Sequence, residues 1–270
     1  MTGSTGVMSR RTLLRDLGHG AFALAVVGLA GCTGKAPSTS PPSTFDPLNY
    51  MGNLDEIESV WCEKDLPSEP QLQVTQPWGR VGDARASGYV LVRGGEATII
   101  DTGPWCTVEV IEAALSAVGL DWAAVGSVII THKHPDHWVG LSTAFALGQE
   151  AAIFAGAPDI PHIGSPRPVK PVGAGDRVMD LAIIPTPGHT PGHIAVHDAA
   201  AGVLVVGDAV YASDAGVLDM LPSSEDLTRA RASLGSLVDL SFDTLLPGHG
   251  FPIIGGAWEA LSGYIAEGGN

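Results

Sequence analysis

Potential metal ligands are concentrated in one short segment, residues 131–137 (THKHPDH), which directly follows an apolar run. Alternate residues of an extended chain point to the same side, so His132, His134 and Asp136 can be aimed at one point, while His137 takes a neighbouring direction. Imidazole nitrogens and carboxylate oxygens are donors by which proteins hold Zn²⁺. This cluster of four donors predicts a site for two metal ions side by side, rather than a solvated polar loop.

Three later segments each offer one more donor. His189 ends the segment 186–189 (TPGH), Asp208 follows Val206 and Gly207, and His249 lies in the segment 247–250 (PGHG). A glycine precedes each of these donors, and glycine allows the backbone to approach a bound group closely. One such histidine alone would be an ordinary loop residue. Together with the first cluster, the three segments give five histidines and two aspartates for a single site.

The elements that must position these residues follow from apolar patterning. Valine- and isoleucine-rich runs predict strands at 89–92, 97–100, 127–130, 151–155, 181–185, 194–197, 203–206 and 244–246. Helical patterns occupy 108–118, 141–147, 225–240 and 257–265, and Ser223 or Ser224 is expected to cap the third. The potential ligands follow predicted strands, at the carboxyl ends where ligand sites concentrate. Hairpin-like early strands and later strands alternating with helices predict an α/β protein whose sheets are covered by helices.

Composition limits the possible protein classes. The chain has 270 residues, of which 45% are hydrophobic and 16% charged, so one large or two small domains can bury a core. Disorder throughout and a polytopic membrane protein are excluded. Acidic residues outnumber basic ones by 29 to 14. Such a surface repels phosphate backbones, so nucleic acid is not an expected partner.

The amino-terminal segment predicts export. Arg10 and Arg11 precede an apolar stretch at 21–30 that is about half the ~20 residues needed to span a bilayer, which is typical of a signal peptide. The arginine pair resembles a twin-arginine signal. Residues 29–32 (LAGC) resemble the lipobox of bacterial lipoproteins, whose cysteine is lipidated after cleavage. We therefore expect a protein anchored to the membrane through Cys32 outside the cytoplasm; an uncleaved anchor and an ordinary secretory signal are the alternatives.

The order of the motifs resembles one known family. Asp101-Thr102-Gly103, then HKHPDH, TPGH, GD and PGH, within residues 70–255, are similar to the motifs of the metallo-β-lactamase fold superfamily of metallohydrolases. The resemblance implies a four-layer αβ/βα sandwich, with two mixed β-sheets flanked by helices and the site at the sheets' edge. It implies two zinc ions per chain, with Asp101 orienting a histidine ligand. It assigns His132, His134 and His189 to one zinc, Asp136, His137 and His249 to the other, and Asp208 to a position bridging both.

Two positions distinguish branches of that family. Position 134 is histidine where oxygen-reducing diiron members carry an acidic residue, which favours zinc. Position 208 is aspartate where antibiotic-hydrolysing members typically carry cysteine or serine, which argues against a true β-lactamase. The pattern is closer to the glyoxalase II-like, lactonase-like and small nuclease-like branches. Together with the amino-terminal patterns, the resemblance divides the chain into a signal peptide (1–31), a Ser/Thr/Pro-rich linker (32–54) and a hydrolase domain (55–270).

These inferences predict a dinuclear zinc hydrolase that uses a metal-bound hydroxide to cleave an ester, thioester, lactone or amide bond of a small molecule. Asp136 is expected to orient that hydroxide or to accept its proton. A phosphodiesterase or nuclease of the same fold and a non-catalytic metal-binding lipoprotein are the alternatives. His193 is expected to support the ligands. Trp138 and Tyr211 are candidates for the substrate pocket, with core or rim packing as the alternative.

Two further cysteines allow two interpretations. Outside the cytoplasm, Cys62 and Cys106 can form a disulfide, and two buried thiols fit the sequence equally well. The identity of the substrate and the oligomeric state do not follow from the sequence.

Overall fold

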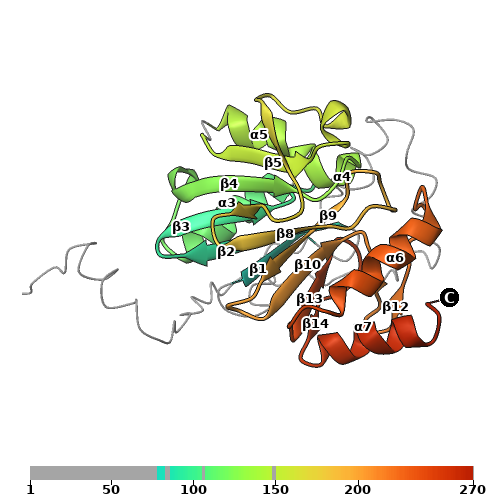
Figure 1. Cartoon of the computed structure of the whole chain (residues 1–270). Helices are drawn as coiled ribbons and strands as arrows, with labels where there is room; N and C mark the ends of the chain where they lie inside the picture. Colours follow the sequence, from blue (N-terminus) through green and yellow to red (C-terminus); the bar gives the residue numbers. More distant parts are fainter. Residues whose placement is uncertain (1–77, 83–85, 105–106, 148–149, 270) are drawn as a thin grey trace, which may run out of the picture. The chain divides into compact units, whose positions relative to one another are not determined.

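Two six-stranded mixed sheets lie face to face at the centre of the computed structural model, which describes residues 78–82, 86–104, 107–147 and 150–269 (Figure 1). In the first sheet the strands follow the chain order, with β1 to β3 antiparallel and β3 to β6 parallel. These strands are β1 (Trp78–Gly82), β2 (Ser87–Arg93), β3 (Glu96–Ile100), β4 (Val125–Ile130), β5 (Ala152–Gly156) and β6 (Val169–Val172).

The second sheet has the order β14-β13-β10-β9-β8-β7, in which only the β10–β13 pair is parallel. Its strands are β7 (Arg177–Val178), β8 (Leu181–Pro185), β9 (Ile194–Asp198), β10 (Val203–Gly207), β13 (Thr244–Pro247) and β14 (Ile253–Ile254). A small separate hairpin consists of β11 (Tyr211–Ala212) and β12 (Leu218–Asp219).

Alternation along the strands explains the layers. In β3, Ile100 points into the core between the two sheets, whereas its neighbour Ile99 packs against helices on the other face. In β10, Val205 and Leu204 divide in the same way between the inter-sheet core and the second helical layer. Helices α3 (Thr107–Ala117) and α5 (Gly140–Ala146) cover the first sheet; α6 (Leu227–Leu237) and α7 (Ala257–Ala266) cover the second. The predicted four-layer αβ/βα sandwich is therefore confirmed.

Each of the eight predicted strands overlaps a strand of the structure, and each predicted helix overlaps a helix. The start of the third predicted helix was wrong, because α6 begins at Leu227 and its N-cap is Asp226, not Ser223 or Ser224. The Asp226 carboxylate accepts a hydrogen bond of 2.9 Å from the Arg229 amide. Elements that were not predicted include β1, β6, the two-residue strands, the short helix α4 (Pro135–Trp138) and the 3-10 turns η2 (Trp122–Ala124) and η3 (Ile160–His162).

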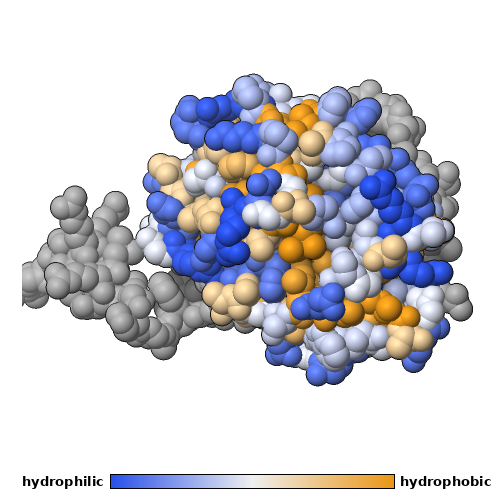
Figure 2. Space-filling model, in the orientation of Figure 1, coloured by the Kyte–Doolittle hydropathy of each residue, from blue (hydrophilic) through white to orange (hydrophobic). Residues whose placement is uncertain are grey.

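Several sequence expectations concern residues outside the described part of the chain. These are the signal peptide, the linker, Cys32, Cys62 and Cys106, which stay predictions. All described residues belong to one unit, Pro47–Asn270. None of their helices combines the length and the apolar character needed to cross a bilayer. Figure 2 shows that hydrophilic residues cover much of one face, with apolar areas between them.

Candidate metal centre

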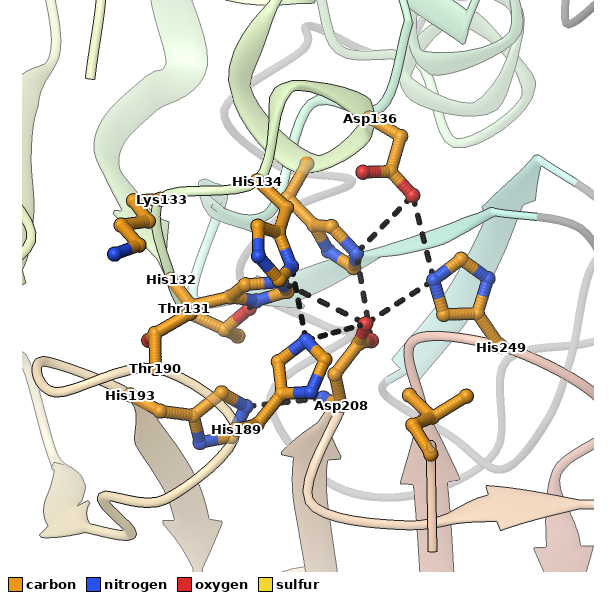
Figure 3. A network of polar contacts seen from close by, with 12 residues as sticks. Thr131, His132, Lys133, His134, Asp136, His189, Thr190, His193, Asp208 and His249 are labelled. Atoms are coloured by element: carbon orange, nitrogen blue, oxygen red, sulfur yellow. Dashed lines mark hydrogen bonds and ion pairs between the residues drawn. The ribbon is translucent and has the colours of Figure 1, made fainter. Parts of the chain in front are cut away.

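The loops that follow four strands meet at one edge of the two sheets and bring the seven potential ligands together (Figure 3). The first four ligands come from the loop after β4 and from α4, and one each follows β8, β10 and β13. Their candidate ligand atoms form two groups, in each of which all atoms lie within 4.8 Å of one another. The first group is His132, His134, His189 and Asp208, and the second is Asp136, His137 and His249.

In the first group, three imidazole nitrogens face a carboxylate oxygen. Nδ1 of His134 lies 3.0 Å from Nε2 of His132 and 2.9 Å from Nε2 of His189. Oδ2 of Asp208 lies 3.6 Å from Nε2 of His132 and 3.2 Å from Nε2 of His189. All four residues are buried.

In the second group, Oδ2 of Asp136 lies 3.5 Å from Nε2 of His137 and 3.3 Å from Nε2 of His249. Asp208 also reaches this group, with Oδ1 at 3.4 Å from Nε2 of His137 and Oδ2 at 3.1 Å from Nε2 of His249. One carboxylate therefore faces both sets of nitrogens. Figure 3 shows Asp208 with contacts to ligands on both sides.

Hydrogen bonds on the outer side of the rings assign their tautomers. Oγ1 of Thr131 donates to Asp101 at 2.7 Å and therefore accepts from Nδ1 of His132 at 3.0 Å. Oγ of Ser224 donates to the Leu221 carbonyl at 2.8 Å and accepts from Nδ1 of His189 at 3.2 Å. Nε2 of both histidines consequently carries a lone pair directed at the Asp208 carboxylate.

This convergence of acceptors fits a metal ion. Lone pairs and a carboxylate oxygen repel one another, and the single Nδ1–H that His134 can carry satisfies only one of its two neighbours. Nε2 of His137 and Oδ1 of Asp208 are also buried without a hydrogen-bond partner in the described part of the chain. Because buried polar atoms are costly without partners, a cation between them relieves both problems. The donor set suits divalent ions such as zinc.

Comparison with known proteins agrees with this geometry. The model of the metallo-beta-lactamase superfamily matches residues 81–144 and 147–249, which include all seven ligands. The chain belongs to the metallo-beta-lactamase superfamily. The family resemblance of its motifs is thereby confirmed.

Three similar proteins illustrate this membership. A hydroxyacylglutathione hydrolase of Dechloromonas aromatica is 29% identical over 163 residues, which cover 58% of this chain and 55% of that protein. The crystal structure of the metallo-beta-lactamase family protein TTHA1429 from Thermus thermophilus gives a TM-score of 0.53 at 24% identity, covering 68% and 74% of the two chains. The structure of TTHA1623 in a di-iron-bound form gives a TM-score of 0.54 at 26% identity, covering 66% and 94%.

Coverage differs between these comparisons. The chain spans about half the length of the curated relatives that it matches.

Asp101 lies behind the candidate ligands and contacts one of them. Its Oδ2 lies 2.7 Å from Nδ1 of His137, and its Oδ1 accepts from the Thr131 amide at 2.7 Å. The residue adopts a left-handed backbone conformation with φ of 56°, which is uncommon for residues other than glycine. Its carboxylate therefore connects ligands of both groups, directly to His137 and through Thr131 to His132.

His193 also lies behind the ligands. Its Nε2 accepts a hydrogen bond of 3.0 Å from the backbone amide of Asp208. Its Nδ1 must then carry the hydrogen, which it donates to Oγ1 of Thr186 at 2.7 Å. His193 thus holds the backbone of Asp208 in place. Both of its ring nitrogens are used in these hydrogen bonds, so neither is needed as a metal ligand.

Sequence reasoning missed Ser224 and Asp159 as supports of the site. Asp159, which is fully buried, accepts hydrogen bonds from the amides of Lys133 at 3.0 Å and Gly192 at 2.7 Å. It also accepts from Oγ1 of Thr190. Asp159 therefore joins the loop after β4, which contains Lys133, to the loop that carries His189. An aspartate before a 3-10 turn carries no sequence signal for this role, because its partners lie far away along the chain.

The two candidate pocket residues have different surroundings. Trp138 packs against the core cluster beneath the first sheet, and its Nε1 donates to the Lys133 carbonyl at 2.8 Å. The structure thus gives Trp138 the packing role that was the alternative. Tyr211 is half-buried in β11 and lies beside Gly250, the residue after His249. Contact of either residue with a substrate stays a prediction.

Charges at the site are strongly coupled. Burial acts to raise the pKa of Asp136, but the neighbouring His137 and His249 outweigh it and hold that pKa at about 2. Burial also acts to lower the pKa of His249, yet Asp208 and Asp136 raise it to about 10. In the first group, burial and the neighbouring His189 lower the pKa of His134 to about 4. The carboxylates are therefore ionised at neutral pH, and His134 is a neutral donor.

Proposed function

We propose that this chain is a dinuclear zinc-dependent hydrolase that cleaves an ester, thioester, lactone or amide bond of a small molecule. The observation that carries the proposal is the position of Asp208. Its Oδ2 lies 3.2 Å from Nε2 of His189 and 3.1 Å from Nε2 of His249, residues of opposite ligand groups. A carboxylate shared between two groups of nitrogens is suited to two cations side by side.

In this proposal, each group would hold one ion, and Asp208 would be available as a ligand to both. Five neutral imidazoles and two carboxylates leave a positive site when two divalent ions are bound. Such a site stabilises a carbonyl oxygen that gains negative charge during hydrolysis. A pair of bound divalent ions supplies Lewis acidity and lowers the pKa of water from 15.7 to about 7. Histidine at position 134 supports zinc, and the di-iron form of TTHA1623 makes iron the competing outcome of metal analysis.

Asp136 is proposed to orient the attacking water and to accept its proton. Its carboxylate is the more exposed of the two in the site, at 16% against 3% for Asp208. Its low pKa keeps it ionised, and the nearby Nε2 atoms of His137 at 3.5 Å and His249 at 3.3 Å fix its direction. Substrate and water are therefore expected to enter from the side of Asp136 and His249, since the residues of the first ligand group are all buried.

The test uses the purified full-length protein, loaded with zinc and analysed for metal content. Two zinc ions per chain and turnover of p-nitrophenyl esters, lactones or an acylglutathione thioester are expected. Asp136→Asn should abolish turnover, while Asp239→Asn, which changes an exposed carboxylate after α6, should not. If the protein hydrolyses bis-p-nitrophenyl phosphate and none of the other substrates, it is a phosphodiesterase and the proposal is wrong. Fewer than two metals, or no turnover of any substrate, would overturn it.

We also propose that the protein is a lipoprotein outside the cytoplasm, anchored through Cys32. The support is the sequence of residues 1–32, with its arginine pair, apolar stretch and lipobox-like end. Mass spectrometry of the membrane fraction should find an amino terminus at a lipid-modified Cys32. The Cys32→Ala variant should either keep its signal peptide or lack the lipid modification. An unmodified amino terminus at another residue in the wild type would exclude the anchor.

A further inference from the structure

The loop that carries His249 belongs to the second sheet, yet its carbonyl groups are bound by residues of the first. The hydroxyl of Tyr89 donates to the carbonyl of Pro247 at 2.6 Å, and the amide of Ser87 donates to that of Gly248 at 2.8 Å. Nη2 of Arg80 donates to the carbonyl of Gly250 at 2.8 Å. Three contacts from β1 and β2 therefore fix the backbone on both sides of His249.

Arg80 is the unexpected member of this set. It is 6% exposed, and within the described part of the chain its hydrogen bonds go to neutral oxygens. Its Nε and Nη2 both donate to Oγ of Ser87, at 2.9 and 2.6 Å, which fixes the plane of the guanidinium. Burial of a charge is costly without strong partners. This arrangement directs a rigid, charged donor at the carbonyl next to His249.

Small movements of this loop directly reach His137 of the second ligand group and Asp208, which faces both groups. A Cβ atom on Gly248 would lie 2.2 Å from Oδ1 of Asp208 and 2.8 Å from Cε1 of His137, so the backbone is already in close contact with two ligands. The loop also sets the distance of 3.3 Å between Nε2 of His249 and Oδ2 of Asp136. The first ligand group is supported by other residues, among them Ser224 behind His189.

We propose that Arg80 is a positioning residue for His249 and sets the affinity of the second metal position. The inference rests on the proposed dinuclear site. Removal of the guanidinium leaves the Gly250 carbonyl without its charged donor, so the loop can shift and His249 leaves its place in the group. Residues that hold a metal ligand in orientation typically change metal affinity by about 10–100-fold when they are removed.

The test is zinc titration of the full-length protein against a chromophoric chelator, which reports two dissociation constants without any substrate. Arg80→Met should weaken the second zinc about tenfold or more and leave the first within about twofold. Arg93→Met is the matched control, because Arg93 also connects the sheets, through Asp198 at 2.7 Å, but at the far end of β2. It should leave both dissociation constants unchanged.

A second background separates positioning from general stability. With His249→Ala, the loop no longer offers a ligand, so adding Arg80→Met should change the remaining zinc affinity no further. Arg80→Lys keeps the charge without the planar fork and should lose part of the affinity; it replaces Arg80→Met if that variant does not fold. Equal weakening of both zinc positions, or the same effect of Arg80→Met with and without His249, would overturn the inference. A wild-type protein that binds fewer than two zinc ions would instead overturn the proposed function.

Discussion

The backbone amide of Asp208 donates a hydrogen bond of 3.0 Å to Nε2 of His193, a histidine that is itself held by Thr186. Because Asp208 faces both ligand groups, loss of this bond should weaken both metal positions together. We expect His193→Ala to lower both zinc affinities about 10–100-fold. Chelator competition on the full-length protein measures both values in one titration.

His162 provides the control for that substitution. It is an exposed histidine in η3, so His162→Ala should leave both zinc affinities unchanged. An affinity change confined to one metal position in His193→Ala would contradict the role given to the Asp208 backbone.

Asp159 should contribute strongly to stability, because its buried carboxylate accepts hydrogen bonds from the Lys133 and Gly192 amides. Asp159→Asn removes the charge and places an amide group opposite a donor. We expect the free energy of unfolding to fall by about 2–3 kcal/mol, as for a lost hydrogen bond to a charged group. Urea unfolding of the metal-free protein measures the change.

The matched variant is Asp176→Asn, whose exposed carboxylate accepts from the Gly173 amide at 2.8 Å. It should cost less than about 1 kcal/mol, because water replaces the lost bond. Similar losses for the two variants would show that the position of Asp159 between the two ligand loops has no special weight.

The ligand cluster and the strands could be predicted because their signals are local. His132 and His134 follow an apolar strand at alternate positions, and each later ligand directly follows a glycine at or after the end of its own strand. The expectation that Asp136 shares their side was wrong, because Asp136 lies in α4 and joins His137 and His249. Strand alternation likewise separates Ile99 from Ile100 and gives the layered fold.

Arg80, Asp159 and Ser224 could not be predicted as supporting residues, because their partners are distant in sequence. Arg80 and Gly250 lie 170 positions apart in the sequence, and Ser224 and His189 lie 35 positions apart. Ser224 also shows how tertiary contact changes a local signal. Its hydroxyl is used by His189 and Leu221, and Asp226 becomes the N-cap of α6 instead.

Gly248 should tolerate no side chain. A Cβ atom there would lie 2.2 Å from Oδ1 of Asp208, so Gly248→Ala must displace either the loop or the carboxylate. We expect loss of the second zinc and at least about a hundredfold loss of hydrolysis, since a misplacement of about 1 Å can cost that much. Zinc content and turnover of the best substrate from the panel are the measurements.

Gly235 in α6 is the comparison, because no atom lies within 4 Å of its added Cβ. Gly235→Ala should keep full activity and raise the free energy of unfolding by about 0.5–1 kcal/mol, as alanine favours a helix over glycine. Full zinc content in Gly248→Ala would show that the loop has more freedom than the close contacts imply.

The metal-free protein should be most stable near pH 6.5 and lose stability on both sides. Burial, with the neighbouring His189, lowers the pKa of His193 to about 3 and that of His134 to about 4. Their unfolded forms, with a pKa near 6.5, bind protons first as the pH falls, so stability decreases from about pH 6.5 towards 4. The pKa of His249 is raised to about 10 by Asp208 and Asp136 against the effect of burial. The folded form then holds a proton that the unfolded form releases, so stability decreases as the pH rises from about 6.5 to 10.

The alkaline loss can be tested by a variant, because it depends on other histidines than the acidic loss. These are His249 and also His137, whose pKa is raised against the effect of burial by Asp208, Asp136 and Asp101. His249→Gln removes the group that holds its proton up to about pH 10, so the urea midpoint should fall less steeply between pH 7 and 10 than in the wild type. The fall below pH 6.5 should persist, since His193 and His134 are retained. Zinc added in excess should reduce the alkaline loss in the wild type, because a metal ion competes with that proton for the same nitrogen. An unchanged alkaline slope in His249→Gln would mean that His249 does not hold the proton assigned to it between Asp136 and Asp208.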